Sequence, residues 1–382
     1  MLALAGGTSA QNYENSRSLE EIGGSPQNLL ARIESPPLGL PPLPQPDYNP
    51  ATVARIDLGR KLFFDRRLSF NRTLSCAMCH VPEQGFTQRE LRTPVGIEGR
   101  FVKRNSPSLL NVGYRTVLFH DGREDSLENQ VWQPLLKQNE MANPSIGFVL
   151  QTIRDADDYD GLFEAAFTRG LTAETLGMAL ASYQRGLVAG DSAFDRWHFG
   201  KDRQAMDERA LQGWELFQDK GCSSCHVVEQ ASAQFTNEAF YDTGIGYARS
   251  MGIGTEPLAV RLAPGVEIVP TVSFELPEAN DLGRYEATGH SADRWLYRVP
   301  SLRNVALTAP YMHDGSMPTL AAVIDYYDTG GVQHQGLDPR IKPLGLTPAE
   351  KRSLEAFLES LTSRDIDDLV RDARSQAIGD SR

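Results

Sequence analysis

The residues with the clearest chemical signature are the four cysteines, which form two CxxC pairs, each followed directly by a histidine. The two sites are Cys76-Ala-Met-Cys79-His80 and Cys222-Ser-Ser-Cys225-His226. Two thiols at this spacing can form thioethers with the two vinyl groups along one porphyrin edge, and the adjacent imidazole can then reach the iron as its proximal ligand. The pattern therefore predicts two covalently bound c-type haems, with His80 and His226 as iron ligands.

Other uses of paired cysteines account for less of this pattern. A zinc site needs four ligands close together, whereas the two pairs lie 146 positions apart (222 − 76). A thioredoxin-like redox motif would explain one pair, but neither the second pair nor the two histidines. Four cysteines in 382 residues also exclude a scaffold stapled by disulfides. Covalent haem is the interpretation that uses all six residues.

An internal repeat indicates how the two sites are positioned. Three short strings recur at a constant offset of 193 residues, without a gap. They are Pro107-Ser108-Leu109 with Pro300-Ser301-Leu302, Asn111-Val112 with Asn304-Val305, and His120-Asp121-Gly122 with His313-Asp314-Gly315. Upstream of each CxxCH, the segment from Gly59 to Phe63 echoes the segment from Gly213 to Phe217. A repeat of this kind predicts a duplicated domain, with one copy for each haem.

The repeat and the hydrophobic periodicity together predict a mainly α-helical protein made of two cytochrome c-like haem domains with long loops. The predicted parts are a Pro-rich N-terminal extension over 1–50, a first haem domain over 51–200, a second over 201–365 and a polar tail over 366–382. Helical spacing is clearest over 159–186, 207–217 and 348–361, whereas 227–297 is expected to be a long loop region with short strands.

Composition limits the partners and the location of the protein. With 38 Lys and Arg against 50 Asp and Glu, the net charge of −12 argues against nucleic acid or an anionic membrane as a main partner. No apolar run approaches the roughly 18 residues that span a bilayer. Because haem attachment of this type occurs outside the cytoplasm, we expect an exported, periplasmic protein. Residues 1–10 are apolar and small, but they lack the basic start and full apolar core of a signal peptide.

The residue opposite each proximal histidine decides whether the iron carries electrons or meets substrate. Residues 319–331 predict a helix in the second domain on which Tyr327 shares an inward face with three apolar residues, while Tyr326 points elsewhere. The counterpart of Tyr327, 193 residues earlier, is Pro134, which has no ligating side chain. Tyr327 is thus a candidate sixth ligand of the second haem, and the first haem is expected to keep an open site.

Alternatives to these assignments remain at this point. Tyr327 could be a buried core aromatic, with Met312 or Met317 as the axial ligand instead. Near the expected open site, Gln130 offers a hydrogen-bond donor and Glu140 a general acid or base. The histidines at positions 120 and 313 each precede Asp-Gly, so a role as turn residues is the simpler alternative for them.

Over about residues 51–362 the chain resembles the bacterial dihaem cytochrome c peroxidases and their relative MauG. The resemblance is carried by Arg104-Asn105-Ser106-Pro107, His120-Asp121-Gly122-Arg123, Glu140-Met141, Val299-Pro300-Ser301-Leu302-Arg303-Asn304 and Thr308-Ala309-Pro310-Tyr311-Met312-His313-Asp314-Gly315. It implies proximal ligands at His80 and His226, distal residues at Gln130 and Glu140, and a calcium site at Asn105, Thr308 and Pro310. It also implies that Tyr327 is the MauG-type ligand, where the peroxidases carry methionine.

Three positions depart from the family pattern. His120, which we count as a candidate catalytic residue, stands where the family has a tryptophan between the haems, so the route of electronic coupling differs here. Lys220 replaces a tryptophan of the MauG docking surface, so the MauG substrate, a precursor of methylamine dehydrogenase, is not expected. The distal histidine of resting peroxidases is missing at the first haem, which predicts activity without reductive activation.

These features together predict a periplasmic, MauG-like dihaem oxidoreductase that uses hydrogen peroxide to oxidise a redox partner or a protein. It would contain two haem c groups and one calcium ion. The first alternative is an ordinary dihaem cytochrome c peroxidase that takes electrons from a small cytochrome or cupredoxin. The second is a non-enzymatic dihaem electron-transfer cytochrome. The sequence determines neither the partner nor the oligomeric state, for which a homodimer is one candidate.

Overall fold

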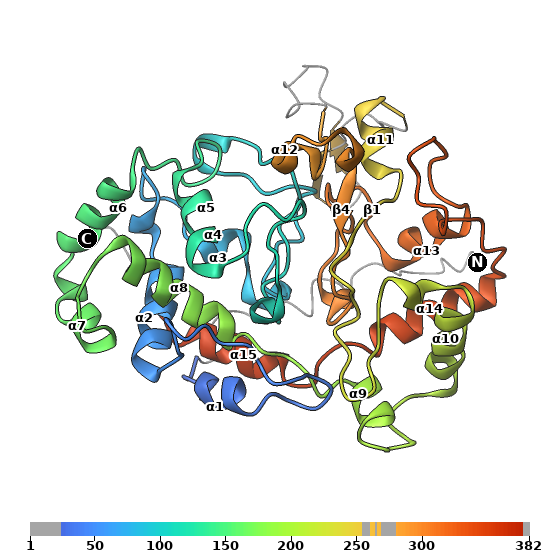
Figure 1. Cartoon of the computed structure of the whole chain (residues 1–382), viewed down its shortest axis with the longest axis horizontal. Helices are drawn as coiled ribbons and strands as arrows, with labels where there is room; N and C mark the ends of the chain where they lie inside the picture. Colours follow the sequence, from blue (N-terminus) through green and yellow to red (C-terminus); the bar gives the residue numbers. More distant parts are fainter. Residues whose placement is uncertain (1–23, 254–259, 264–265, 269–279, 377–382) are drawn as a thin grey trace, which may run out of the picture.

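A computed structural model describes residues 24–253, 260–263, 266–268 and 280–376. Two helical bodies lie side by side, and the short strands β1 and β4 run between them (Figure 1). The first body contains α1 (Leu29–Glu34), α2 (Val53–Phe64), α3 (Cys76–Cys79), α4 (Leu127–Gln130), α5 (Trp132–Leu136), α6 (Ile146–Arg154), α7 (Leu162–Ala166) and α8 (Ala173–Gly186). The fold is mainly helical, as predicted.

The second body follows after residue 190. Its helices are α9 (Ala193–His198), α10 (Glu208–Asp219), α11 (Ile245–Ser250), α12 (Tyr285–Thr288), α13 (Leu320–Asp328) and α14 (Pro348–Glu359), and α15 (Ile366–Arg374) follows them in the chain. Two antiparallel pairs of strands accompany them, β1 (Phe240–Asp242) with β4 (Leu296–Arg298) and β2 (Val260–Ala263) with β3 (Val266–Ile268). The described part of 227–297 thus consists of loops with short elements, as expected.

One helix crossing organises each body, α2 against α8 in the first and α10 against α14 in the second. A glycine lies at the centre of each crossing. A Cβ atom at Gly59 would lie 1.9 Å from the carbonyl oxygen of Ala179, and one at Gly213 would lie 1.9 Å from that of Ser353. The echo between the two sequence segments before the CxxCH motifs therefore reflects the same close approach of two helices.

The backbone preserves the 193-residue offset. Asn111 and Asn304 both adopt the left-handed conformation, with φ of 60° and 61°. The pair Phe119 and Met312 does so as well, with φ of 64° and 73°. Isolated bridges join Leu118 to Glu124 and Tyr311 to Met317, which are again 193 residues apart. The repeated strings therefore form the same turns in both bodies.

Each body has its own hydrophobic core. The first core gathers buried residues between positions 29 and 189, together with Leu369 and Ala373, and the second gathers buried residues between positions 194 and 361. The change from one core to the other falls between Ala189 and Phe194. This position lies about ten residues before the boundary that the sequence predicted.

The two ends of the described chain are more structured than the sequence predicted. Residues 366–374 are not a polar tail but helix α15, whose Leu369 and Ala373 are 0% exposed within the core of the first body. Asp372 of this helix accepts a hydrogen bond from Arg60 at 2.9 Å. Apolar residues at positions 366, 369, 370 and 373 follow a helical period, and the charged residues between them obscure that pattern in the sequence.

The described part of the Pro-rich extension, residues 24–50, packs against both bodies. Leu29 and Ile33 of α1 are buried in the first core. Further along, the carbonyl oxygen of Gly39 accepts hydrogen bonds from Arg303 Nη2 at 2.6 Å and from the Ala233 amide at 2.9 Å, both in the second body. The segment thus acts as a strap across the two bodies.

One predicted helix is divided in the structure. The pattern over 159–186 becomes α7 and α8, because Gly170 has a φ of 64° and Thr172 begins a new helix with a capping box. Within the described residues, no helix is long and apolar enough to cross a bilayer.

Candidate functional site

The first CxxCH motif forms a single tight turn. Cys76–Cys79 make up α3, and the His80 amide donates to the Cys76 carbonyl oxygen at 3.0 Å. The imidazole Nδ1 of His80 lies 3.0 Å from the carbonyl oxygen of Phe86. Because Nδ1 donates to this carbonyl, the lone pair of Nε2 is left to face a metal ion, as is usual for histidine ligands.

The second motif repeats this arrangement. His226 Nδ1 lies 2.9 Å from the carbonyl oxygen of Phe235. Phe86 and Phe235 both adopt the left-handed conformation, with φ of 56° and 51°, and each presents its carbonyl group to a proximal histidine. An α-helical phenylalanine contacts each imidazole, with ring centroids 6.5 Å apart for Phe63 and His80 and 6.4 Å apart for Phe217 and His226.

The surroundings of both motifs suit a porphyrin. All four cysteines are half-buried thiols rather than disulfides. Burial raises the pKa of Cys76 and Cys79 to about 12 and that of Cys222 to about 11, so these thiols lie in apolar surroundings. Burial also lowers the pKa of His80 to about 4, which keeps its imidazole neutral and able to bind iron. The donor atoms and the burial both fit one haem at each motif.

Tyr327 lies on α13, near the second motif. Burial raises its pKa above the ordinary value, and the neighbouring Tyr326, Cys222 and Cys225 raise it further. The two tyrosines diverge, because Tyr326 donates its hydroxyl to the Thr243 carbonyl oxygen at 2.7 Å. In the part of the chain that the structure describes, the Tyr327 hydroxyl has no hydrogen-bond partner. The structure thus places Tyr327 near the cysteines that would hold the second haem.

The corresponding part of the first body is built differently. Its helix is broken into α4, which ends at Gln130, and α5, which contains Pro134. Glu140 follows α5, pairs with Lys137 at 3.0 Å, and lies close enough to Cys79 for its charge to raise the pKa of that thiol. Glu140 is therefore near the first motif. Gln130 is half-buried at the end of α4, and within the described residues its side chain makes no hydrogen bond.

His120 lies at the junction between the two bodies. Its Nε2 lies 3.0 Å from the carbonyl oxygen of Asn105, whose amide in turn donates to the His313 carbonyl oxygen at 2.8 Å. The His120 carbonyl oxygen accepts a hydrogen bond from the Arg298 amide at 2.8 Å. Burial lowers the pKa of His120 to about 3, so the imidazole is neutral. The two histidines of the repeated His-Asp-Gly strings are therefore linked through Asn105.

The three residues expected to bind calcium are only partly brought together. Asn105 is buried and donates its Nδ2 to the Arg92 carbonyl oxygen at 2.9 Å, which leaves Oδ1 as an acceptor. Its bond to His313 brings it towards the turn that contains Pro310. Thr308 donates its hydroxyl to the Val305 carbonyl oxygen at 3.1 Å. Over the described ranges, no group of three or more acidic, histidine or cysteine side chains could hold a metal ion.

Sequence reasoning missed the ion pairs that hold the bodies together. Arg104 donates to both carboxylate oxygens of Asp281 at 2.7 Å and to Asp121 at 2.6 Å, and all three side chains are buried. Asp121 belongs to the first body and Asp281 to the second. Arg104 stands in one of the recognised strings, but no sequence pattern indicated a partner 177 residues away.

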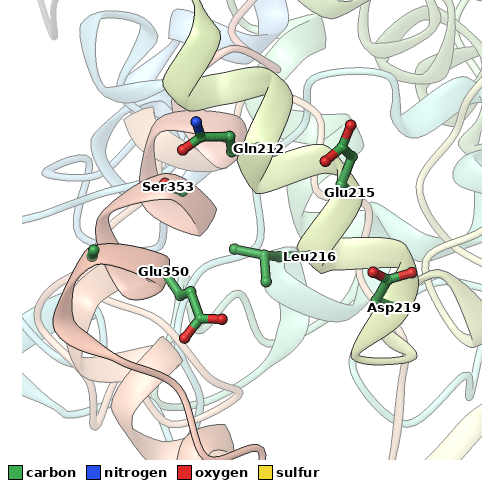
Figure 2. A pocket seen from close by; sticks show the side chains of 7 residues that line it. Gln212, Glu215, Leu216, Asp219, Glu350 and Ser353 are labelled. Carbon is green, nitrogen blue, oxygen red and sulfur yellow. The ribbon is translucent and has the colours of Figure 1, made fainter.

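A surface groove of about 270 Å³ opens between α10 and α14 (Figure 2). Three acidic residues, Glu215, Asp219 and Glu350, lie around Leu216 in its lining. It contains no cysteine or histidine and none of the predicted site residues. The groove is therefore separate from the candidate haem sites.

The two helical bodies and the two motifs define a c-type dihaem protein, and comparisons place it in a family. A profile described as "Di-haem cytochrome c peroxidase" matches residues 53–203. The methylamine utilization protein MauG of Methylorubrum extorquens is 35% identical over 84% of this chain and 81% of its own length. The cytochrome-c peroxidase IdrP1 of Denitromonas iodatirespirans is 34% identical over 86% of each chain. The chain belongs to the dihaem cytochrome c peroxidase and MauG family.

A solved structure supports the same assignment. A MauG-like protein associated with microbial copper homeostasis matches with a TM-score of 0.71 and 30% identity, over 87% of this chain and 96% of that chain. The relatives are named both MauG and cytochrome c peroxidase, and both are haem peroxidase-type oxidoreductases. This protein is accordingly an oxidoreductase of that type with two c-type haems.

Proposed function

We propose that the protein is a periplasmic, MauG-like oxidoreductase that uses hydrogen peroxide, with Tyr327 as the sixth ligand of the second haem. The observation that carries the proposal is the asymmetry between Tyr327 on α13 and Pro134 on α5 at the equivalent position of the repeat. A phenolate ligand favours oxidised iron, whereas a methionine would raise the reduction potential. The second site would therefore store oxidising equivalents, and the first would remain open to peroxide.

Haem bound at the two motifs would supply iron that exchanges electrons with peroxide. His80 and His226 would each bind through Nε2, because Nδ1 is engaged by a phenylalanine carbonyl group. Near the first motif, the Glu140 carboxylate would take a proton from one peroxide oxygen and return it to the departing oxygen. The Gln130 amide would orient the peroxide by a hydrogen bond. The neutral imidazole of His120 would connect the two halves by its hydrogen bond to Asn105, whose amide donates to His313.

Substitution of Tyr327 tests the ligand assignment. We expect Tyr327→Phe and Tyr327→Met to change the EPR and near-infrared signals of the second haem, because each removes the phenol. The adjacent Tyr326→Phe is the matched control, since Tyr326 points to Thr243, and it should leave these signals unchanged. Unchanged spectra in both Tyr327 variants would refute the assignment and favour an ordinary cytochrome c peroxidase.

We also propose one calcium ion beside Asn105, bound by neutral oxygen atoms that include Thr308 and Pro310. The free Oδ1 of buried Asn105 supports this proposal, because amide and carbonyl oxygens are ligands that calcium accepts. Metal analysis should find one calcium per chain, and Asn105→Ala should lose it. Asn71→Ala, at an exposed position of the first body, should retain it. Equal calcium content in both variants would exclude this site.

A further inference from the structure

Outside the candidate haem sites, four side chains form a compact group that we call the Tyr247 cluster: Asp242, Tyr247, Trp295 and His334. The rings of Tyr247 and His334 stack almost in parallel, with centroids 4.1 Å apart and planes 7° apart. Trp295 packs edge-on against both, at 5.2 Å from Tyr247 and 5.7 Å from His334. The imidazole Nε2 of His334 lies 3.2 Å from a carboxylate oxygen of Asp242, and both side chains are buried.

The cluster is connected to Tyr327 through Tyr326 and two of its main-chain hydrogen bonds. The rings of Tyr327 and Tyr326 meet edge to face, with centroids 5.6 Å apart. The Tyr326 hydroxyl donates to the Thr243 carbonyl oxygen at 2.7 Å, and Thr243 directly follows Asp242 in the chain. The same hydroxyl accepts from the Val332 amide at 3.2 Å, two residues before His334. The Tyr326 hydroxyl is thus linked to the cluster through the main chain, on one side next to Asp242 and on the other two residues before His334.

The cluster also reaches the protein surface. Trp295 is half-buried, and its indole Nε1 donates to Ser250 Oγ at 3.0 Å. Directly after Ser250, Met251 is 54% exposed and Ile253 is also exposed. Trp295 has a left-handed φ of 60°, a conformation that bulky residues rarely adopt, and its amide is held by the Leu282 carbonyl oxygen at 2.9 Å. The indole is thus fixed next to an exposed apolar segment.

We propose that the Tyr247 cluster is an electron-entry route, through which an external one-electron donor at the α11 surface reduces the second haem site. The proposal rests on the proposed function. Indole and phenol are the protein side chains besides thiols that lose an electron most readily, and here Trp295 and Tyr247 are both half-buried, with Trp295 bonded to Ser250 beside exposed Met251. The donor is a small redox protein whose apolar contact face fits the exposed Met251 and Ile253.

The electron count of this route is balanced. Each hydrogen peroxide that is reduced to two water molecules takes up two electrons and two protons. One electron leaves the Trp295 indole, whose Nε1 proton stays in the hydrogen bond to Ser250, so the oxidised ring carries a positive charge. The donor then returns an electron to the indole. A second passage of the same kind supplies the second electron, and solvent supplies the protons.

Without a donor, the oxidised ring should persist long enough to be trapped. We would treat the holoprotein with peroxide in the presence of a nitroso spin trap and map the adducts by peptide mass spectrometry. We expect adducts on Trp295 or Tyr247. Trp295→Phe should lose the Trp295 adduct. Tyr247→Phe should lower the yield of the Trp295 adduct while keeping the ring packing. Tyr326→Phe should lower the yield of adducts on both Trp295 and Tyr247. The control Trp197→Phe, at a half-buried tryptophan of the same body, should leave the adducts unchanged.

The outcomes separate this inference from the proposed function. The inference is overturned if peroxide is consumed but the adducts form outside the cluster. It is also overturned if the Tyr326→Phe and Tyr247→Phe variants give the same yield of Trp295 adduct as the parent protein. In either case the cluster would serve only in packing. If peroxide is neither consumed nor changes the haem spectra, the proposed function fails and the inference fails with it. The Tyr247 and Tyr326 variants keep the test decisive if Trp295→Phe does not fold.

Discussion

The two bodies share the side that would hold the proximal histidine and differ on the opposite side. In both, a left-handed phenylalanine presents its carbonyl group to the imidazole, and a glycine lets two helices cross closely. On the opposite side, the second body has the continuous nine-residue helix α13 with Tyr327. The first body has two short helices and Pro134 instead. The two halves thus differ at the helix that, in the proposed function, would control access to the iron.

The proline explains how the first body tolerates this change. Pro134 lies in the first turn of α5, where an amide group would have no partner within the helix. Its position therefore costs no helical hydrogen bond, and it removes the side chain that could close the site. In the proposed function, the open first site would come from the missing ligand at Pro134 rather than from a different arrangement around His80.

The largest expected effect contrasts Glu140 with its repeat counterpart Gln333 (140 + 193). Loss of a general acid or base typically slows a reaction about 10²- to 10⁴-fold, so Glu140→Gln should lower kcat/KM for peroxide by about this factor. Gln333 donates to the Gly330 carbonyl oxygen at the end of α13, and Gln333→Leu should leave peroxide turnover nearly unchanged. Steady-state peroxide consumption measures both. Equal rates in the two variants would mean that the bodies do not differ in this chemistry.

The next effect concerns the contact between the bodies. Arg104→Leu removes both hydrogen bonds from Arg104 to the buried Asp281 carboxylate and leaves Asp121 with Arg123 alone, which should lower the free energy of unfolding by about 3–5 kcal/mol. The control is Arg100→Leu, because Arg100 pairs with Glu98 at an exposed position, where the loss should stay below about 1 kcal/mol. Denaturant unfolding gives both values. A small loss for Arg104→Leu would show that the bodies are held mainly by other contacts.

The two helix crossings should respond alike. Gly59→Ala and Gly213→Ala each force a methyl group against a helix carbonyl oxygen, and overpacking of this kind costs about 1–3 kcal/mol. Thermal unfolding of the holoprotein measures the two losses. Gly147→Ala, within α6, where a Cβ atom would meet only the Ser145 hydroxyl at an ordinary contact distance of 3.7 Å, controls for the loss of a glycine as such. A loss in only one of the two variants would show that the crossings are not equivalent.

The smallest expected effect is at the helix caps. Thr172 and Thr347 begin α8 and α14 with capping boxes, so Thr172→Ala and Thr347→Ala should each cost about 1 kcal/mol. Thr152→Ala, within α6, removes no cap and should cost less. The same unfolding measurements apply. Unequal losses in the two variants would show that the two caps do not contribute equally to stability.

Local features of the fold could be predicted from the sequence, whereas contacts between residues far apart in the chain appeared only in the structure. The CxxCH motifs, the repeated turns and the orientation of Tyr327 relative to Tyr326 could be anticipated, because each depends on residues within a few turns of chain. The Arg104–Asp281 pair joins residues 177 positions apart, and only the folded chain brings them together. The Tyr247 cluster likewise assembles residues from three separate segments.

Helix α15 has a consequence for how the molecule is made. It follows the whole second body in the chain, yet Leu369 and Ala373 fill the core of the first. Because a chain is synthesised from its N-terminus, α15 is made only after the whole second body. The core of the first body therefore cannot be completed until the second body has been synthesised. Assembly of the two halves is therefore completed in the reverse of their order of synthesis.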